Sequence, residues 1–145
     1  MRNLAIGTLI GICFALVANS PGRAGQSSTP SSAERACAPG SVHLRTTLYF
    51  GLTRPTGRVS ERQWQNFLAE EVTPRFPDGL TVWQADGQWR QTDGRISRER
   101  AKVLLLVHEE TPAVRSALAA IVVNYKRSFQ QESVLWETSP VCAAF

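Results

Sequence analysis

Residues 80–109 read LTVWQADGQWRQTDGRISRERAKVLLLVHE, and this stretch decides the fold. Its two halves are strand-like runs joined by an Asp-Gly turn within residues 92–94. The first run predicts a strand with a bulge or a twist at Gly87, because glycine inside a strand often marks such a site. The second run contains Val103–Val107, which is apolar at every position and therefore typical of a central strand. A long hairpin is thus expected in the middle of the chain.

A strand precedes the hairpin, at HLRTTLYF (His43–Phe50). Its β-branched and aromatic residues favour extended structure, and their alternation predicts two different faces. The first face carries Leu44, Leu48 and Phe50, and the second carries His43, Arg45, Thr47 and Tyr49. Because the first face is apolar, we expect it to pack against helices. The segment GLTRPTGR that follows is expected to be a loop.

A helix is expected next, at VSERQWQNFLAEEV (Val59–Val72). Ser60 is its predicted N-cap, and Gln63 completes a capping box. Apolar residues recur at helical spacing and predict a buried stripe made of Trp64, Phe67, Leu68 and Val72. Thr73 and Pro74 end the helix, because a residue before proline is pushed out of the α region.

A second helix and a last strand are predicted after the hairpin. Thr111 is the expected N-cap of this helix, and Pro112 is its first residue. Its apolar stripe consists of Val114, Ala117, Leu118, Ile121, Val122, Tyr125 and Phe129. The segment SVLWET (Ser133–Thr138) predicts the final strand.

The predicted order of elements is therefore βαββαβ. Its usual solution is an α+β fold, the ferredoxin-like plait: a four-stranded antiparallel sheet of spatial order 4-1-3-2 with both helices on one face. In that arrangement the first strand runs antiparallel beside the last strand. The start of one then lies next to the end of the other.

The first 25 residues have the pattern of a secretory signal peptide, with Arg2 ahead of the uncharged apolar run Leu4–Ala18. This run is fifteen residues long, short of the roughly 20 that span a bilayer, so a permanent anchor is the less favoured alternative. The polar residues 26–36 predict a disordered leader, and residues 37–145 a single α+β domain. We expect a periplasmic or secreted protein, with no stable membrane insertion after cleavage.

Two cysteines, Cys37 and Cys142, remain once Cys13 leaves with the signal peptide. An even pair in an oxidising compartment suggests a disulfide, and the predicted topology brings these two positions together. Closing a loop of about 105 residues would stabilise the fold by a few kcal/mol in the chain-entropy model. Two unpaired thiols are the less favoured alternative.

The charge and the motifs of the chain point to no cofactor, metal or nucleic acid. Loss of Arg2 and Arg23 with the signal peptide would lower the formal net charge from +4 to +2, spread over scattered arginines. The sequence has no P-loop, GxGxxG, GxSxG, HExxH or CxxC motif. We therefore expect none of these three kinds of partner.

Four segments carry a resemblance to a known family: TLYFGL (residues 47–52), VTPRFPDGLTV (72–82), GQWR (87–90) and AKVLLLVHE (101–109). With them, the chain resembles a bacterial exported family of unknown function, the domain-of-unknown-function family numbered 3574. The resemblance covers about Cys37 to Trp136, and one segment within it is the most specific part. That most specific segment is TPRFPDGLTV, residues 73–82. The resemblance implies a small exported protein, and it assigns no activity, cofactor, partner or catalytic residue.

Two histidines and a carboxylate form the first candidate site. In the expected sheet His43 and His108 lie at the same end, and the alternation places both on the face away from the helices. Glu137, near the end of the last strand, would join them as a metal or acid–base set. Arg45 on the same face would repel a cation, however, so ordinary surface histidines are the favoured alternative.

Arg75 and Asp78 form the second candidate site, at the same end of the sheet. A guanidinium can bind a carboxylate or a phosphate with two hydrogen bonds, and the helix N-terminus at Thr111 would point donors into this region. The alternative is that Arg75 pairs with Asp78 or caps the preceding helix while Phe76 packs into the core. This structural role is the favoured one.

The sheet face away from the helices is expected to be apolar, with Tyr49, Trp83, Leu104, Leu106 and Leu135 on it. Exposed patches of this kind usually meet a partner, and two such sheets packed face to face would form a dimeric α/β barrel. A loop or the leader covering this face is the alternative. RNA-recognition domains share this strand order, but they carry aromatic residues where Leu104 and Leu106 stand.

The favoured hypothesis for function is a non-enzymatic exported module that binds a small molecule, or a second copy of itself, through this face. Its ligand-binding candidates are Arg45, Tyr49, Arg75, Asp78 and Trp83. The alternative is an enzyme acting on a small anionic or aromatic compound, with His108 or His43 in acid–base catalysis and Arg75 as an anion clamp.

Overall fold

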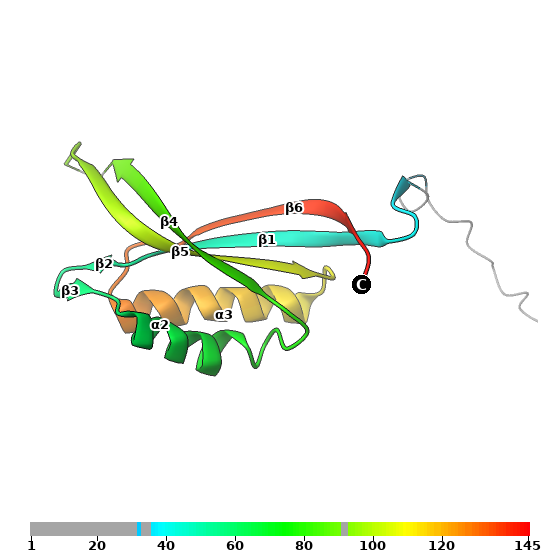
Figure 1. Ribbon diagram of the computed structural model, residues 1–145, viewed down its shortest axis with the longest axis horizontal. Helices are drawn as coiled ribbons and strands as arrows, with labels where there is room; N and C mark the ends of the chain where they lie inside the picture. Colours follow the sequence, from blue (N-terminus) through cyan, green and yellow to red (C-terminus); the bar gives the residue numbers. More distant parts are fainter. Residues whose placement is uncertain (1–31, 33–35, 91–92) are drawn as a thin grey trace, which may run out of the picture.

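The structure is a computed structural model that describes residues 32, 36–90 and 93–145. Four long strands form one sheet: β1 (Ser41–Gly51), β4 (Thr81–Arg90), β5 (Ile96–His108) and β6 (Leu135–Ala143). Two helical segments complete it: α2 (Glu61–Phe67), which continues as the π-helical turn η1 (Leu68–Val72), and α3 (Pro112–Phe129). Both helices cover the same face of the sheet (Figure 1). The described chain is thus an α+β protein with two layers.

The predicted signal peptide (residues 1–25) lies outside the described residues, and so does the predicted leader (residues 26–36) apart from residues 32 and 36. Both stay predictions. Among the helices of the described part, none combines the length and the apolar character needed to cross a membrane.

The sheet is antiparallel, and its strand order is β4-β5-β1-β6. These labels differ from the predicted order 4-1-3-2 because they also count two short strands. Those strands, β2 (Thr53–Arg54) and β3 (Gly57–Arg58), form a small separate hairpin in the segment predicted as a loop. Among the four long strands alone the order is 2-3-1-4, which becomes 4-1-3-2 when it is read from the β6 edge.

The hairpin of β4 and β5 has no bulge. Its pairing runs without a break from Thr81 opposite Leu105 to Arg90 opposite Ile96, and Gly87 pairs with Glu99. The predicted bulge at Gly87 is therefore wrong, and the twist is what the strands show, because the far end of the hairpin turns away from the rest of the sheet (Figure 1). Since β1 ends opposite Ala101, the hairpin beyond that point is a two-stranded ribbon.

The core lies between the sheet and the two helices. Both predicted helical stripes are buried in it or packed against it, which confirms them. On the sheet side the core takes alternate residues of the two central strands, namely Leu48, Phe50, Leu104 and Leu106. These side chains are almost completely buried, so this face of the sheet forms one wall of the core.

The positions of Leu104 and Leu106 correct the sequence analysis, which placed them on the opposite face. Leu104 pairs with Leu48 and Leu106 pairs with Thr46, and directly opposed residues share a face of the sheet. Because Leu48 faces the helices, both leucines do so too. The face away from the helices, called the open face below, carries Val103, Leu105 and Val107 of β5 instead.

The helix starts follow the sequence closely. The Ser60 side chain accepts a hydrogen bond from the backbone N–H of Gln63, and the Gln63 side chain accepts one from the backbone N–H of Ser60. This is the predicted capping box. Thr111 caps α3 through the N–H of Val114, and Pro112 is the first residue of that helix, as expected.

A disulfide joins Cys37 to Cys142, with their Cα atoms 5.1 Å apart. It forms because β1 and β6 are antiparallel neighbours, so that Val42 near the start of β1 lies opposite Cys142. The bond confirms the predicted meeting of the two ends. It links positions 105 residues apart in the sequence.

A chain of polar side chains crosses the sheet on the helix-facing side. The Trp136 indole donates to the Thr138 hydroxyl, which lies 2.9 Å from the Thr46 hydroxyl. Thr46 in turn lies 2.9 Å from Nε2 of His108, whose Nδ1 is 2.8 Å from the Glu109 carbonyl oxygen. An indole N–H only donates and a carbonyl only accepts, so a neutral His108 gives the chain one direction. The chain ties β6, β1 and β5 together around the buried Thr46.

Replacing Thr46 by valine tests this chain. Valine has nearly the same shape but no hydroxyl, so it leaves Thr138 and Nε2 of His108 without their partner. We expect Thr46→Val to lower the free energy of unfolding by about 1–3 kcal/mol in urea denaturation. The control Thr46→Ser keeps the hydroxyl and loses a methyl group, which costs about 1 kcal/mol. A valine variant as stable as the wild type would show that the chain adds nothing.

Candidate functional site

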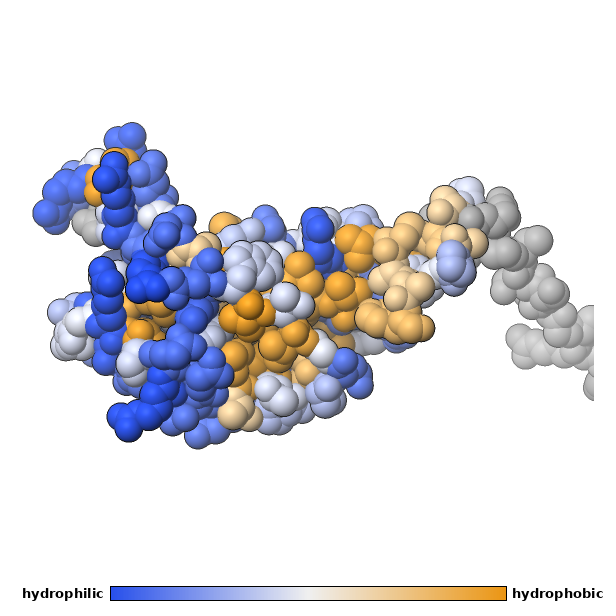
Figure 2. All heavy atoms as spheres, in the orientation of Figure 1, coloured by the Kyte–Doolittle hydropathy of each residue, from blue (hydrophilic) through white to orange (hydrophobic). Residues whose placement is uncertain are grey.

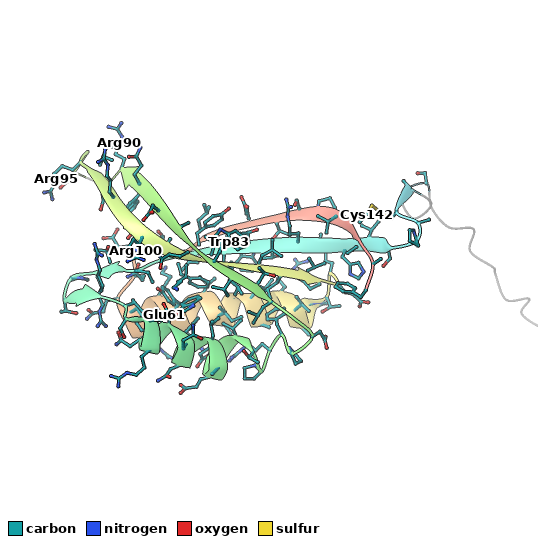
Figure 3. The ribbon with its side chains drawn as sticks, in the orientation of Figure 1. Glu61, Trp83, Arg90, Arg95, Arg100 and Cys142 are labelled. Atoms are coloured by element: carbon teal, nitrogen blue, oxygen red, sulfur yellow. A yellow bond between two sulfur atoms is a disulfide. The ribbon has the colours of Figure 1, made fainter. Side chains whose placement is uncertain are left out.

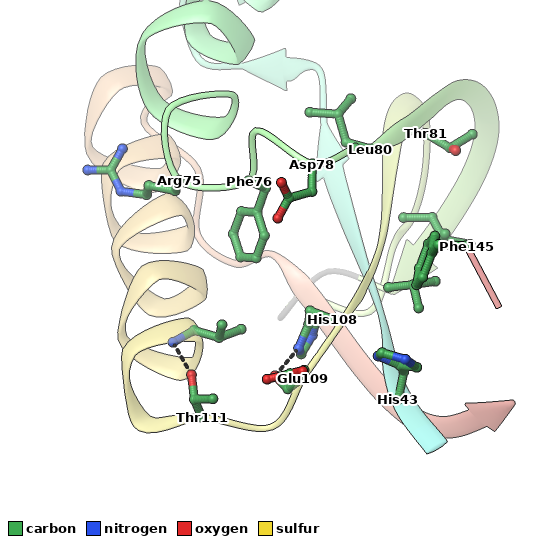
Figure 4. Close-up of a pocket in the computed structure, with 14 residues that line it drawn as sticks. His43, Arg75, Phe76, Asp78, Leu80, Thr81, His108, Glu109, Thr111 and Phe145 are labelled. Carbon is green, nitrogen blue, oxygen red and sulfur yellow. Dashed lines mark hydrogen bonds between the residues drawn. The ribbon is translucent and has the colours of Figure 1, made fainter. Parts of the chain in front are cut away.

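A hollow of about 790 Å³ lies where β5 ends and β4 has not yet begun. The first residue of β4, Thr81, pairs with Leu105, so the last residues of β5 have no strand beside them on that edge. The segment that leads into β4 and the N-terminus of α3 form the other walls (Figure 4). We call this space the β5-end hollow. Its principal lining residues are His43, Phe76, Asp78, Val107, His108 and Phe145.

His108 reaches the hollow from the helix-facing side of the sheet. It pairs with Leu44 and lies two residues beyond Leu106, so its side chain points toward the helices, where it contacts Thr46 and lies near Phe76. The predicted placement on the open face is therefore wrong. Both of its ring nitrogens already take part in hydrogen bonds within the protein.

His43 enters the same hollow from the opposite face. It pairs with Val141 of β6 and adjoins Leu44, and neighbouring residues of a strand point to opposite faces. Its Nε2 lies 2.8 Å from the Ser41 hydroxyl, and its ring meets the ring of Phe145 edge-on at 5.6 Å between centroids. The hollow thus wraps around the end of the sheet and brings both predicted histidines to its walls (Figure 4).

Glu137 does not join the histidines. It pairs with Thr47, four residues along β6 from the partner of His43, and its carboxylate accepts a hydrogen bond from the Tyr49 hydroxyl at 3.0 Å. This hydrogen bond is the main cause that raises the pKa of Tyr49. The predicted set of two histidines and Glu137 is therefore not assembled. Within residues 36–90 and 93–145, no three metal-binding side chains come together.

Arg75 has the structural role that the sequence analysis favoured. Its guanidinium donates to the backbone carbonyl of Glu71 and lies 3.1 Å from the Glu71 carboxylate, at the end of η1. In Figure 4 this side chain points away from the hollow, whereas the carboxylate of Asp78 points toward it. Arg75 is a lining residue of the hollow, but its guanidinium is engaged with Glu71.

The walls of the β5-end hollow combine apolar surface with a few polar atoms. The apolar part comes from the loop before β4, from β5 and from α3, namely Phe76, Leu80, Leu105, Val107 and Val114. The polar part includes the Asp78 carboxylate and the His43 ring. Concave, largely apolar sites with a few convergent polar groups are the usual form of small-molecule sites. The arrangement can enclose an apolar ligand body and accept hydrogen bonds from its polar end.

The open face is apolar, as expected, but with a different set of residues on β5. The register places Tyr49, Trp83 and Leu135 on it, together with Val103, Leu105 and Val107. Trp83 is 43% exposed and Leu135 is 61% exposed. Arg45 shares this face and its guanidinium lies 3.5 Å from the Ser139 hydroxyl. No helix covers this side in Figure 1.

A second hollow, of about 600 Å³, lies at the far end of the open face and was missed by sequence reasoning. Four small residues of three adjacent strands, Gly51, Ala85, Gly87 and Ala101, form part of its lining. Glu99 reaches over Gly51, where a Cβ would stand only 3.0 Å from its carboxylate oxygens. The signal that could have revealed this hollow is the cluster of small residues, which only the strand register brings together.

Comparison with known proteins shows the family of this chain and other structures with a similar fold. The sequence model of a family described as protein of unknown function (DUF3574) matches residues 45–145. The chain belongs to the DUF3574 family. No curated protein sequence matches it.

Solved structures show where the fold of this DUF3574 protein recurs. A phage SAM lyase in complex with S-methyl-5'-thioadenosine has a TM-score of 0.55 and 13% identity, over 70% of this chain and 90% of the lyase chain. The phage SAM lyase in the apo state has a TM-score of 0.53 and 12% identity, over 72% of this chain and 92% of the lyase chain. CutA from Synechococcus elongatus has a TM-score of 0.43 and 15% identity, over 72% and 83%. The lyase shares the fold of the DUF3574 protein at the level of chain path.

The carboxylate of Glu99 gives a prediction for the second hollow of the DUF3574 protein. Burial raises the pKa of Glu99 above its usual value, against a weaker opposing effect of the Thr53 backbone. A raised folded-state pKa of an acid means that the charged form weakens the fold above that pKa and that stability recovers as the pH falls through it. Glu99→Gln should therefore raise the free energy of unfolding at pH 7 by less than about 1 kcal/mol, since solvent screens this carboxylate.

The difference should vanish below about pH 4, where the wild-type carboxyl is protonated in both states. Urea denaturation at pH 7 and below pH 4 measures it, with the exposed Glu70→Gln on η1 as the control. A Glu99→Gln variant that is less stable than the wild type at pH 7 would show that the carboxylate is instead bound favourably.

Proposed function

We propose that this DUF3574 protein is a binding module that takes a small molecule in the β5-end hollow. The observation that carries the proposal is a concave site of about 790 Å³ whose apolar walls meet polar groups that the fold does not use. The Asp78 carboxylate is exposed, and Nδ1 of His43 is buried with no hydrogen-bond partner among the described residues. A buried polar atom without a partner can form a hydrogen bond with a ligand that reaches it, and this bond stabilises the complex.

The chemistry of the walls restricts the ligand. An apolar or aromatic body fits against Phe76, Val107 and Phe145, and a hydrogen-bond donor or a positive charge fits the Asp78 carboxylate. A strongly anionic ligand would meet Asp78 and Glu109 at the rim, while Arg75 is held by Glu71. We therefore favour a neutral or cationic compound with an apolar core over the small anion considered from the sequence.

The same contacts favour binding over the acid–base alternative. Hydrogen bonds to Thr46 and to the Glu109 carbonyl hold both ring nitrogens of His108, so the ring serves the fold. A general base needs a nitrogen within hydrogen-bond reach of the proton that it removes. His43 alone retains such an atom, and the carboxylate expected to assist it, Glu137, is engaged with Tyr49.

We also propose that the fold is a ferredoxin-like plait and that the protein is exported. The strand order and the two helices on one face support a ferredoxin-like plait. The Cys37–Cys142 disulfide supports export to the periplasm or out of the cell, because such bonds persist in oxidising compartments.

A ligand screen tests the proposed site directly. We expect hits among neutral or cationic compounds with an aromatic or apolar core, and S-methyl-5'-thioadenosine is a useful first probe because a protein of this fold binds it. For a hit, Asp78→Asn and His43→Ala should each weaken binding about tenfold in calorimetric titration, as the loss of one hydrogen bond in an apolar site does. The exposed Asp86→Asn, on the ribbon, is the matched control.

Asp78 is exposed and Asn keeps its shape, so this variant is expected to fold normally. A confirmed hit whose affinity is unchanged in both Asp78→Asn and His43→Ala would place binding elsewhere. Hits restricted to strongly anionic compounds would contradict the proposed ligand chemistry.

A second candidate function is self-association through the open face. It is favoured by the exposure of Trp83 and Leu135 beside the apolar β5 residues of that face, an arrangement more typical of an interface than of a surface left to water. A copy related by a two-fold axis would bury the same patch on both subunits.

Sedimentation separates this candidate from the first. The wild type should sediment as a dimer, and Trp83→Asp should shift it to the monomer by placing a charge in the apolar interface. Val123→Asp, at an apolar residue of α3 that is also exposed, is the control and should leave the dimer intact. A wild type that stays monomeric, or a Trp83→Asp dimer, would rule this candidate out.

A further inference from the structure

Three arginines meet at a shallow hollow at the opposite end of the sheet from the β5-end hollow. Arg58 comes from the β2–β3 hairpin, and Arg98 and Arg100 come from the two-stranded ribbon of β4 and β5. The hollow between them has a volume of about 440 Å³. We call it the arginine hollow. Hydrophilic side chains crowd this part of the molecule around the projecting ribbon (Figure 2).

The strand register explains why the side chains gather on one face. Arg98 and Arg100 are two residues apart on β5, so both point to the same side of the ribbon. They lie opposite Gln88 and Asp86 of β4, which share that side and also line the hollow. Arg100 lies where the ribbon leaves the body of the protein, and Arg90 and Arg95 stand at its far end (Figure 3).

The arginine hollow holds more positive than negative charge. In the part of the chain that the structure describes, the four ion pairs involve Arg75, Lys102, Arg95 and Arg115. Arg58, Arg98 and Arg100 take part in none of them, and all three are exposed. Asp86 is the carboxylate on their side of the ribbon, so the three guanidinium groups outnumber the carboxylates that share their face.

Two other carboxylates lie nearby, and Glu99 is also a lining residue of the arginine hollow. The carboxylate of Glu99 lies over Gly51, on the side of the second hollow. The pKa of Glu61 is lowered chiefly by its hydrogen bond with Lys102, at 2.7 Å, and next by the hydrogen bond that it accepts from Gln65. The charge of Arg100 lowers it only weakly. Arginines brought together without enough carboxylates repel one another unless an anion lies between them.

We propose that the arginine hollow binds a phosphate-type oxyanion. Guanidinium groups present paired N–H donors in a plane, which suits the oxygens of a phosphate, and several of them together suit a doubly charged group better than a single carboxylate. Gln88 adds an amide donor on the same side. The phosphate is either a soluble compound or the headgroup of a lipid, toward which the ribbon with Arg90 and Arg95 would extend.

The site is independent of the proposed function, because it shares no lining residue with the β5-end hollow. It also differs from a nucleic-acid site. Trp89 pairs with Ser97 and therefore lies on the opposite side of the ribbon from Arg98. Among the described residues that line the arginine hollow, none is aromatic, so a base would find no ring there to stack on.

Titration of the protein with inorganic phosphate and with pyrophosphate tests the proposal, with the arginine Nε–Hε signals followed by NMR. We expect saturable shifts of the signals of Arg58, Arg98 and Arg100, and tighter binding of pyrophosphate. Arg98→Gln and Arg100→Gln should each weaken pyrophosphate binding roughly tenfold, and Arg98→Lys should weaken it less because it keeps the charge but loses the paired donors.

Arg115→Gln, at the far end of α3, is the control and should leave the affinity unchanged. Because the three arginines make no ion pair in the described residues, their variants should keep the wild-type circular dichroism spectrum. Absence of saturation, or equal loss in Arg115→Gln, would overturn the proposal.

Vesicles distinguish the two sources of phosphate. If vesicles of phosphatidylglycerol bind the protein, vesicles of phosphatidylcholine do not, and both pyrophosphate and Arg98→Gln abolish the binding, the ligand is a lipid headgroup. If neither vesicle binds and pyrophosphate does, the ligand is a soluble phosphate compound. Vesicle binding that is insensitive to Arg98→Gln, without pyrophosphate binding, would contradict a discrete site.

Discussion

The pairing of β1 between β5 and β6 is the constraint on which the rest of the structure depends. Its residues Leu48 and Phe50 are fully buried against the helices, and its register fixes which residues of both neighbours share their face. A shift by one residue would turn this whole apolar set toward water. This one register determines the position of the disulfide and of the polar chain through Thr46. It also brings His43 and His108 to the walls of the β5-end hollow.

Local rules carried much of the fold from the sequence alone. The capping box at Ser60, the Thr111-Pro112 helix start and the two apolar stripes depend on residues within one or two turns, so they can be read directly. The Cys37–Cys142 bond needed only the order of elements. The predictions of these features match the structure because each feature is set by nearby residues or by the topology. Neither of these two causes depends on the detailed packing of side chains.

The face of β5 could not be predicted, because Val103–Val107 is apolar at every position and gives no alternation to read. That single ambiguity displaced Leu104 and Leu106 to the wrong side and carried His108 with them. The partners of His108 and Glu137 were equally hidden, since each is bound by a residue whose position depends on the finished packing. Arg75 differs, because its partner Glu71 lies only four residues away and the capping role was expected. The sequence thus placed His43, Arg75 and His108 at one end of the sheet, where the structure has them, but it did not predict the side-chain contacts of His108.

The two proposed sites lie at distant places on the protein and offer opposite kinds of polar group. At the β5 end, the groups left over accept hydrogen bonds or attract positive charge. Beside the ribbon, the groups left over are donors with positive charge. Between these two places, Lys102 is paired with Glu61. Such a distribution suits a protein that meets two different partners with opposite ends.

The position of Phe145 has a practical consequence. The aromatic ring lies on the wall of the β5-end hollow, three residues after the cysteine that fastens β6 to the start of β1. Anything fused behind this residue, such as an affinity handle for purification, would emerge at the mouth of the hollow and could occupy it. A handle fused ahead of Cys37 would also start near this end of β6, because the disulfide joins Cys37 to Cys142. A handle that can be cleaved off is therefore the better choice for work on this protein.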